Sequence, residues 1–256
     1  MEGQNRFSGR VSIVTGAGSG IGAETARLFA SEGAAVTLVD IDRSAVETVV
    51  AEITAAGGQA VAVICDVRDP DQVDRAVAGA VERFGGVHIL VNNAGVMQEA
   101  TIEQISLDDF TRVMSINLTS AFLFSKAVEG HMRAQRYGKI VMTSSRGMLG
   151  APGYSSYASS KAGMVGLAGA LAWELGPYGI NVNSVAPGHV TTPLTEELAV
   201  KRGGSYEDIR ATAASRIALP DIASPRDIAE VIAFLASDAA RFVTGQAILT
   251  TGRPMQ

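Results

Sequence analysis

Residues 11–22 read Val11-Ser12-Ile13-Val14-Thr15-Gly16-Ala17-Gly18-Ser19-Gly20-Ile21-Gly22, and this stretch decides the fold class of the chain. An apolar, β-branched run leads into a glycine cluster, and residues 23–30 continue as a good helical pattern. Strand, glycine turn and helix form the context that a phosphate-binding turn requires. The missing Cβ atoms let a pyrophosphate approach the backbone at a helix N-terminus. A merely tight turn has the same glycines, but the flanking strand and helix favour a nucleotide site.

Apolar runs and helical patterns alternate along the chain without a linker or a low-complexity break. The predicted strands are residues 10–15, 35–40, 60–66, 88–92, 139–144, 181–186 and 247–249. The predicted helices are residues 21–31, 43–56, 70–84, 107–135, 154–176 and 225–237. Strands that are apolar on both faces belong in a parallel sheet covered by helices on each side. We therefore predict an α/β chain with one doubly wound, Rossmann-type domain over residues 1–256.

The second predicted strand ends in Asp40, about twenty residues beyond the glycines, where dinucleotide-binding units carry a ribose-binding acid. A carboxylate there accepts hydrogen bonds from the ribose hydroxyls and repels a 2′-phosphate. Ile41 and Asp42 follow, and Arg43 is the only base nearby, so the sequence favours NAD over NADP. Asp is also favoured at helix N-caps, which gives Asp40 a second, compatible role.

Tyr157 and Lys161 stand four residues apart, so a helix would present both side chains on one face. A free tyrosine has a pKa of about 10, too high for a base near neutral pH. A fixed positive charge beside it favours the phenolate and lowers that pKa. The spacing therefore indicates a proton-transfer pair, although an isolated match of this kind is common on solvent-facing helices.

Together these features resemble the short-chain dehydrogenase/reductase family over almost the whole chain. The motifs that carry the resemblance are the glycine turn 15–22, Asn92-Asn93-Ala94-Gly95, Asn117, Ser144-Ser145, Tyr157 with Lys161, and Pro187-Gly188-His189-Val190-Thr191-Thr192. The resemblance implies strand order 3-2-1-4-5-6 extended by a seventh strand. It also implies hydride transfer between a secondary alcohol or ketone and a nicotinamide cofactor, taken here as NAD.

In a doubly wound sheet, ligands bind beyond the carboxyl ends of the strands where the strand order reverses. The residues expected to bind the cofactor are Gly16, Ser19, Gly20, Ile21, Gly22, Asp40, Ile41, Asp66, Val67, Asn93, Ala94, Gly95, Tyr157, Lys161, Pro187, Gly188, Val190 and Thr192. For Asp66, a role as a helix-capping acid ahead of Asp69-Pro70 is equally open.

The residues expected to be catalytic are Asn117, Ser145, Tyr157 and Lys161. Tyr157 exchanges a proton with the substrate oxygen, and the serine hydrogen-bonds that oxygen as negative charge builds on it. By resemblance, Lys161 also binds the nicotinamide ribose, and Asn117 holds a water that links Lys161 to solvent.

The position of the catalytic serine depends on how the motif is counted. Counting along the strand from Gly138 favours Ser145, whereas counting back from Tyr157 with the family's commonest spacing favours Ser144. The loop 146–156 is one residue shorter than usual, and a deletion costs less in a loop than in a buried strand. We choose Ser145.

The substrate is the least determined feature of the sequence. Arg146 either faces the substrate pocket, where it would meet a carboxylate or a hydroxyl-rich molecule, or lies on an exposed loop. Residues near 192–220 are expected to form a lid. The C-terminal segment 249–254 departs from the Asp-Gly-Gly turn of many relatives, so a substrate preference tied to that tail is open. The alternative function is an NADPH-dependent 3-oxoacyl-[acyl-carrier-protein] reductase, for which basic residues near 40–43 would be expected.

The bulk properties exclude several classes of partner. The formal net charge of −5 and the absence of a basic stripe argue against nucleic-acid binding. No apolar run approaches membrane-spanning length, and no cluster has metal-ligand spacing. The single cysteine, Cys65, lies in an apolar run and is expected to be a buried thiol. We expect a cytoplasmic protein without membrane partners that acts on a small alcohol or ketone, and family resemblance implies a homotetramer.

Overall fold

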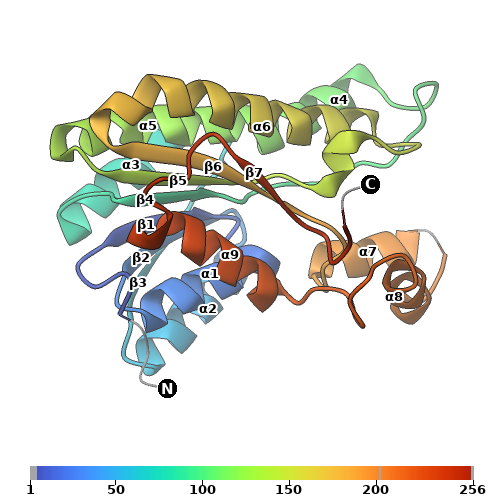
Figure 1. Ribbon diagram of the computed structural model, residues 1–256, viewed down its shortest axis with the longest axis horizontal. Coiled ribbons are helices and arrows are strands. Elements are labelled where there is room, and N and C mark those ends of the chain that lie inside the picture. Colours follow the sequence, from blue (N-terminus) through green and yellow to red (C-terminus); the bar gives the residue numbers. More distant parts are fainter. Residues whose placement is uncertain (1–4, 202, 255–256) are drawn as a thin grey trace.

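The computed structural model describes residues 5–201 and 203–254, which form a seven-stranded parallel sheet with helices on both faces (Figure 1). The strand order β3-β2-β1-β4-β5-β6-β7 confirms the predicted order and its reversal beside β1. The strands are β1 (Val11–Thr15), β2 (Ala35–Asp40), β3 (Gln59–Ile64), β4 (Ile89–Asn92), β5 (Gly138–Thr143), β6 (Ile180–Pro187) and β7 (Ala247–Thr250). Strand β2 has the predicted bounds, and the ends of the other strands differ from the predicted ends by at most two residues, so Cys65 and Asp66 lie beyond β3.

Helices cover both faces of the sheet because the central strands are apolar on both sides. Every residue of β1, β4 and β5 is buried, as a strand between two helical layers requires. One face carries α1 (Gly20–Ser31), α2 (Arg43–Ala55) and α9 (Pro225–Ala236), and the other carries α3 (Pro70–Phe84), α5 (Ser120–Gln135) and α6 (Ser155–Leu175). The buried side chains divide in the same way into two core clusters, one on each face.

The helix predicted over residues 107–135 is interrupted by a π turn. Helix α4 (Leu107–Met114) runs into this turn, Ser115–Thr119, which continues as α5. A π turn inserts one extra residue without changing the apolar periodicity much, so the sequence pattern did not reveal it. The turn carries Asn117, whose side chain is fully buried.

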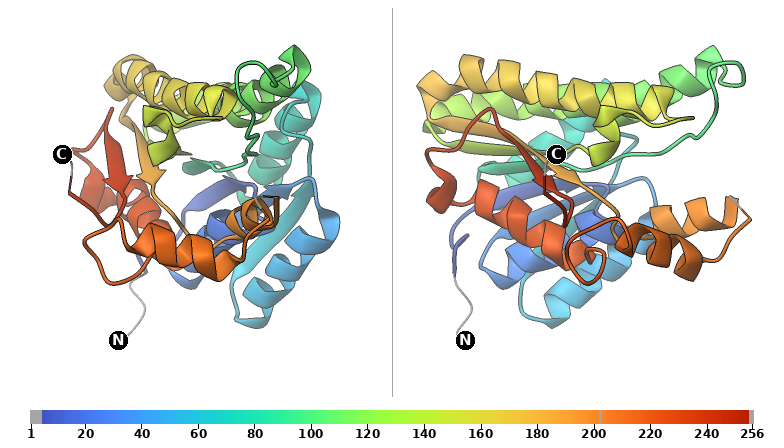
Figure 2. Two further views of the ribbon diagram at one scale, coloured as in Figure 1. Left: turned by 90° about the vertical axis from the view of Figure 1, so that its right-hand side faces the viewer. Right: turned by 45° about the vertical axis from the view of Figure 1, so that its right-hand side comes forward.

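Two short helices lie in the segment expected to form a lid. They are α7 (Pro193–Lys201) and α8 (Tyr206–Ala214), and neither was predicted from the sequence. Figure 2 shows both apart from the helices that cover the sheet, beyond the carboxyl ends of the strands. The chain then enters α9 through a capping box in which Ser224 and Asp227 satisfy each other's backbone amides.

Candidate active site

The glycine turn joins β1 to α1 and packs against the turn after β4. A Cβ atom on Gly16 would lie 2.8 Å from the Cα of Ala94, and one on Gly22 would overlap the Gly16 carbonyl oxygen. Gly16 also has φ +63°, a left-handed conformation that favours glycine. Gly16 lies on the wall of a cavity, whereas Gly22 is buried behind it and shapes the turn without facing the cavity.

The start of α1 is free to bind an anion. Its N-cap residue, Ser19, makes no side-chain capping hydrogen bond, and the first turn has no acidic residue. The first amides of a helix have no partner within the helix, and the helix dipole adds positive potential there. An uncapped N-terminus beside a cavity therefore fits a pyrophosphate.

Asp40 is fixed at the end of β2 by the glycine turn. Its Oδ2 accepts a hydrogen bond from the Gly18 amide at 2.8 Å, and its Oδ1 accepts one from the Asp42 amide at 3.0 Å. The capping role considered for Asp40 was wrong, because Asp42 caps α2 by accepting from the Ala45 amide. Arg43 is paired with Glu47 at 2.9 Å. The wall near Asp40 is therefore acidic.

Asp66 and Val67 line the same cavity just after β3. Asp66 is paired with Arg68 at 2.6 Å, and the hydrogen bonds from that guanidinium lower the pKa of the carboxyl. Asp69, and not Asp66, caps α3 by accepting from the Asp71 and Gln72 amides. The capping alternative for Asp66 was therefore wrong, and this acid remains on the cavity wall.

Thr15, which was not predicted as a site residue, ties the two central turns together. Its Oγ1 accepts hydrogen bonds from the amides of Asn93 and Ala94, both at 3.0 Å. In return, the Asn93 side-chain amide donates to the carbonyls of Thr15 and Gly16. The sequence feature that could have identified Thr15 is a hydroxyl residue at the end of β1, because this strand end lies where the strand order reverses.

Asn117 holds the loop after β4 against α6. Its Oδ1 accepts from the Val96 amide at 2.8 Å, and its Nδ2 donates to the Val96 carbonyl and to Ser160 Oγ, both at 3.0 Å. Asn117 does not line the cavity wall. A Cβ on Gly95 would lie 3.3 Å from both Asn117 Oδ1 and Lys161 Nζ, so this glycine leaves space between the two polar atoms.

The two neighbouring serines face different surroundings. Ser144 is buried, and its hydroxyl donates to the carbonyl of Lys161 at 2.7 Å. The Ser145 hydroxyl accepts from the Gly147 amide at 3.0 Å, and Ser145 lines two adjoining cavities. Geometry therefore puts the Ser145 hydroxyl, and not that of Ser144, beside Tyr157.

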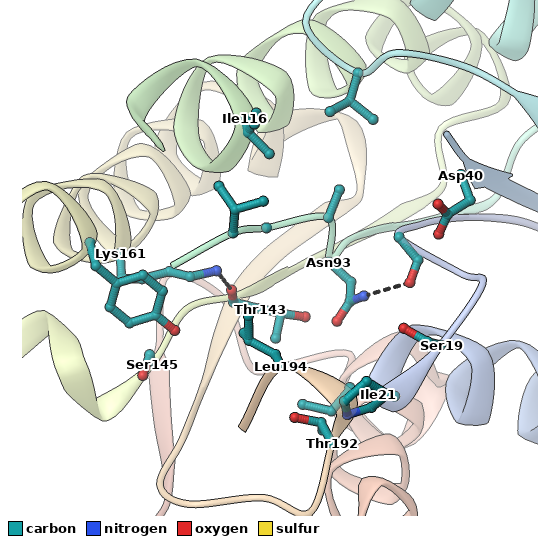
Figure 3. A pocket seen from close by; sticks show the side chains of 18 of the residues that line it. Ser19, Ile21, Asp40, Asn93, Ile116, Thr143, Ser145, Lys161, Thr192 and Leu194 are labelled. Carbon is teal, nitrogen blue, oxygen red and sulfur yellow. Dashed lines mark hydrogen bonds between the residues drawn. The ribbon is translucent and has the colours of Figure 1, made fainter. Parts of the chain in front are cut away.

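Tyr157 and Lys161 project from α6 toward the end of β5, and Figure 3 shows Lys161 pointing to Thr143. The Lys161 ammonium donates to the Thr143 carbonyl at 2.6 Å and lies 5.8 Å from the centroid of the Tyr157 ring. Burial lowers the pKa of Lys161 to about 8. Burial also raises the pKa of Tyr157, and the adjacent Ser145 hydroxyl acts in the opposite direction. Burial therefore reverses the lowering that was predicted for the Tyr157 pKa.

The segment after β6 closes the cavity from the other side. Pro187, Gly188, Val190 and Thr192 all line it. Thr192 begins the lid, where its main chain and hydroxyl are tied to Thr195 by hydrogen bonds. The lid therefore starts from a fixed point beside the glycine turn.

The main cavity, of about 580 Å³, brings together most of the predicted residues. Gly22 and Asn117 are absent from its wall for the reasons given above. The lining residues that were not predicted are Cys65, Arg68, Val96, Arg112, Ile116, Thr143, Pro193, Leu194 and Thr195, besides Ser144, the serine that was not chosen. Most of them directly flank a predicted residue. One end of this cavity has the acidic wall near Asp40 and the uncapped start of α1, and the other end has Tyr157 and Lys161. This arrangement fits a nicotinamide dinucleotide.

A second cavity, of about 380 Å³, adjoins the first. The two share Ser145, Tyr157, Pro187, Gly188, Leu194 and Thr195 on their walls. The second extends under the lid and toward the C-terminal tail. Tyr157 and Ser145 therefore stand at the junction between a space that fits a cofactor and a space for a second molecule.

The described ranges, residues 5–201 and 203–254, contain neither a candidate metal centre nor a candidate membrane span. No group of three or more His, Cys, Asp or Glu side chains there has a geometry that could hold a metal ion. Within the same ranges, no helix has both the length and the apolar character needed to cross a bilayer.

Comparisons with known proteins agree with this geometry. The family model described as enoyl-(acyl carrier protein) reductase matches residues 16–252. The chain is 41% identical to the 3-oxoacyl-[acyl-carrier-protein] reductase FabG of Thermotoga maritima, covering 95% of this chain and 96% of the relative. It is also 41% identical to the cis-4-hydroxycyclohexanecarboxylate dehydrogenase of Sinomonas cyclohexanicum, covering 96% of each. A short-chain type dehydrogenase/reductase from Mycobacterium marinum superposes with a TM-score of 0.90 at 34% identity, covering 97% of this chain and 96% of that one.

Proposed function

The chain belongs to the short-chain dehydrogenase/reductase family, and we propose that it transfers a hydride between NAD and a secondary alcohol or ketone. One observation carries the proposal: the cofactor-shaped cavity and the second cavity meet at Ser145 and Tyr157. The proton donor Tyr157 and the hydrogen-bond donor Ser145 thus lie beside the position that the reacting carbon must occupy.

NAD is proposed over NADP because of Asp40. Its carboxylate is held in place by the Gly18 and Asp42 amides, so it is available to ribose hydroxyls and repels a 2′-phosphate. Arg43 is paired with Glu47 and Arg68 with Asp66. Neither nearby guanidinium is therefore free for a phosphate unless its ion pair breaks.

The residues at the junction supply the proton chemistry. When bound, nicotinamide accepts or donates the hydride at its C4 carbon. In alcohol oxidation the Tyr157 oxygen takes the hydroxyl proton, and in ketone reduction it gives a proton to the substrate oxygen. Ser145 donates a hydrogen bond to that oxygen, an interaction that strengthens as charge develops. With a pKa of about 8, Lys161 is mainly cationic at pH 7 and favours the phenolate by its charge.

Asn117 is proposed to support a proton path. One lone pair of its Oδ1 stays available after the Val96 hydrogen bond, and the space beside Gly95 lies between that oxygen and Lys161. A water there would have polar partners on two sides. Such a water would link Lys161 to solvent.

The pH dependence should follow from Tyr157. Because burial raises its pKa, the phenolate is scarce at pH 7 in the absence of other charges. The kcat/KM for oxidation is therefore expected to rise with pH, and that for reduction to fall as the phenol loses its proton. Initial rates in both directions between pH 6 and pH 10 measure this. Parallel pH profiles in the two directions would contradict the proposed role.

The first test is a substitution that removes the Tyr157 oxygen. Tyr157→Phe should lower turnover by at least roughly 10³-fold, since the proton acceptor is lost, while NADH binding changes little. Tyr178→Phe, at a partly buried tyrosine outside both cavities, is the control. Retained turnover in Tyr157→Phe would remove Tyr157 from the chemistry.

The cofactor is tested by calorimetric titration with NADH and with NADPH. We expect tighter binding of NADH than of NADPH. Asp40→Asn should reduce this preference for NADH, because asparagine keeps an acceptor for the Gly18 amide but loses the negative charge that repels a 2′-phosphate. Tighter binding of NADPH by the unaltered protein would favour the second candidate, a reductase of 3-oxoacyl carrier-protein thioesters. That candidate is suggested by the named Thermotoga relative.

We further propose a homotetramer that packs through α5 and α6. Trp173 on α6 is 88% exposed and Phe122 on α5 is 47% exposed, which is costly for large apolar side chains unless a neighbour covers them. Light scattering after size-exclusion chromatography tests this, and a monomeric mass would refute it. The cytoplasmic location stays a prediction.

A further inference from the structure

The second cavity has three arginines on its wall and, within the described part of the chain, no Asp or Glu. Arg146, Arg216 and Arg253 line it together with Ser145 and Tyr157. The whole chain carries a formal net charge of −5, so the charge of this cavity wall is opposite in sign to that of the chain. A concave site lined by one sign of charge attracts ions of the opposite sign.

The three guanidinium groups have unused hydrogen-bonding capacity. None of them makes a hydrogen bond or an ion pair with another described residue. Arginines elsewhere commonly have a carboxylate partner, as Arg133 has in Glu129 at 2.7 Å. An arginine has five donors and keeps its charge at any physiological pH. Unpaired arginines in one cavity are therefore suited to an anion.

The main chain brings two of these arginines together. The amides of Ala218 and Leu219 both donate to the Gly252 carbonyl, at 2.8 and 3.1 Å. Arg216 lies two residues before the first donor, and Arg253 directly follows the acceptor. These hydrogen bonds hold the end of the lid against the C-terminal tail. Two like charges held in neighbouring segments repel each other, and a bound anion relieves that repulsion.

The rest of the cavity wall is largely apolar. Met97, Leu194, Leu198 and Ile217 lie on it along with the arginines. A volume of about 380 Å³ suits a small molecule. The occupant should therefore combine an apolar body with a charged end.

We propose that Arg146, Arg216 and Arg253 bind a carboxylate of the substrate, so that the enzyme acts on a hydroxy or oxo acid with an apolar body. The carboxylate binds at the arginines, and the reacting carbon lies beside Ser145 and Tyr157 on the same wall. This inference rests on the proposed function for the place of that carbon beside Tyr157. The arginine site itself rests on the geometry of the second cavity.

The first experiment measures binding without turnover. The protein is titrated calorimetrically with cyclohexanecarboxylate and with its neutral isostere, cyclohexanecarboxamide. We expect the acid to bind roughly tenfold more tightly than the amide, as the loss of charge-assisted hydrogen bonds implies. The double variant Arg216→Gln/Arg253→Gln should weaken binding of the acid by roughly tenfold and leave that of the amide unchanged. Equal affinities for acid and amide, or no effect of the double variant on the acid, would overturn the proposal.

The matched control is the double variant Arg75→Gln/Arg83→Gln. Both arginines are exposed on α3 and line neither cavity, so their loss changes the net charge by the same amount as the double variant of the site. The control should bind the acid like the unaltered protein. A similar loss of affinity in the control would show that overall charge, and not this cavity, attracts the acid, which overturns the proposal.

The second experiment compares turnover of 4-hydroxycyclohexanecarboxylate and its carboxamide with NAD. Arg146→Gln should raise KM for the acid severalfold with little change in kcat, because it acts on binding. Turnover of both substrates with equal, arginine-independent efficiency would overturn this inference and leave the proposed function standing. Arginine-dependent binding of the acid without any alcohol or ketone turnover would overturn the proposed function and leave the arginine site standing. Arginine-dependent activity with a carrier-protein thioester alone would also overturn the small-acid site.

Discussion

The two adjoining cavities are built in different ways. The cofactor cavity is walled by the ends of strands and by turns that hydrogen-bond to one another, such as the Thr15 hydroxyl with the amides of Asn93 and Ala94. The second cavity takes much of its wall from the lid and the C-terminal tail, which meet through the Gly252 carbonyl. The difference teaches that a central sheet fixes the shared chemistry, while peripheral segments leave the choice of substrate open to change.

The largest expected effect comes from breaking the cofactor cavity at its turn. Gly22→Ala puts a methyl group onto the Gly16 carbonyl and within 2.6 Å of Asn93 Nδ2. We expect a loss of at least about 3 kcal/mol in unfolding free energy, because the clash is with backbone in a packed turn. NADH binding should be lost as well. Urea denaturation and calorimetry measure the two effects.

A glycine in open space provides the contrast. Gly79 lies within α3, and a Cβ there would have no neighbour within 4 Å. Gly79→Ala should stabilise the protein by about 0.5–1 kcal/mol through helix propensity. Equal effects of the two substitutions would show that the turn is not as tightly packed as the structure indicates.

The second effect concerns a charge buried in the cofactor cavity. The pKa of Lys161 falls from 10.5 to about 8, so the unfolded chain holds this proton more tightly than the folded one. This destabilisation is complete below pH 8 and disappears above pH 10.5, and it amounts to about 3 kcal/mol. Lys161→Met should therefore be inactive yet up to about 3 kcal/mol more stable at pH 7. The gain should shrink toward pH 10, and a gain that is independent of pH would contradict this origin.

The third effect separates the serines at the junction. Ser145→Ala should lower kcat by about 100-fold, since a donor to the reacting oxygen is lost. Ser144→Ala removes the hydrogen bonds to the Lys161 carbonyl and to the Met148 sulfur, so it should cost about 1 kcal/mol of stability with little change in kcat. Steady-state kinetics with NAD and urea denaturation distinguish them. A larger loss of kcat in Ser144→Ala would exchange the two roles.

The smallest effect breaks the second cavity alone. Arg253→Gln removes one guanidinium group from the wall of this cavity and keeps the Gly252 carbonyl that holds the lid segment. We expect kcat/KM for the substrate to fall by about tenfold, as the loss of one charge-assisted contact implies. NADH affinity should stay within about twofold. Equal losses for cofactor and substrate would show that the two cavities are not independent.

The features that were predicted correctly from the sequence are those that depend on the main chain, namely the order of the strands and the glycine turn. Glycines at residues 16–22 and apolar strands leave few alternatives for the doubly wound class and the glycine turn, and the family resemblance supplied the strand order that the structure has. The π turn around Asn117 was missed because one inserted residue barely disturbs the apolar period. Helices α7 and α8 were missed because they are short and lie in a segment interpreted only as a lid.

Predictions about single polar side chains were less successful. Asp42 and Asp69 cap the helices for which Asp40 and Asp66 were considered, because a cap is defined by local backbone geometry that composition does not give. The pKa of Tyr157 rises because burial outweighs the hydrogen bond with Ser145, and burial is a property of the folded chain. The meeting of Arg146, Arg216 and Arg253 joins segments far apart in sequence, so no local pattern could have revealed it.

The uncapped start of α1 couples the heat stability of this protein to its ligand. Amides that no side chain satisfies are left to water until an anion arrives, so a dinucleotide that binds there binds the folded chain alone. At a hundred times its Kd, such a ligand adds about 2.7 kcal/mol to the free energy of unfolding. The melting temperature of the enzyme should therefore report the concentration of its cofactor, and a cell depleted of dinucleotide would hold this protein nearer to unfolding.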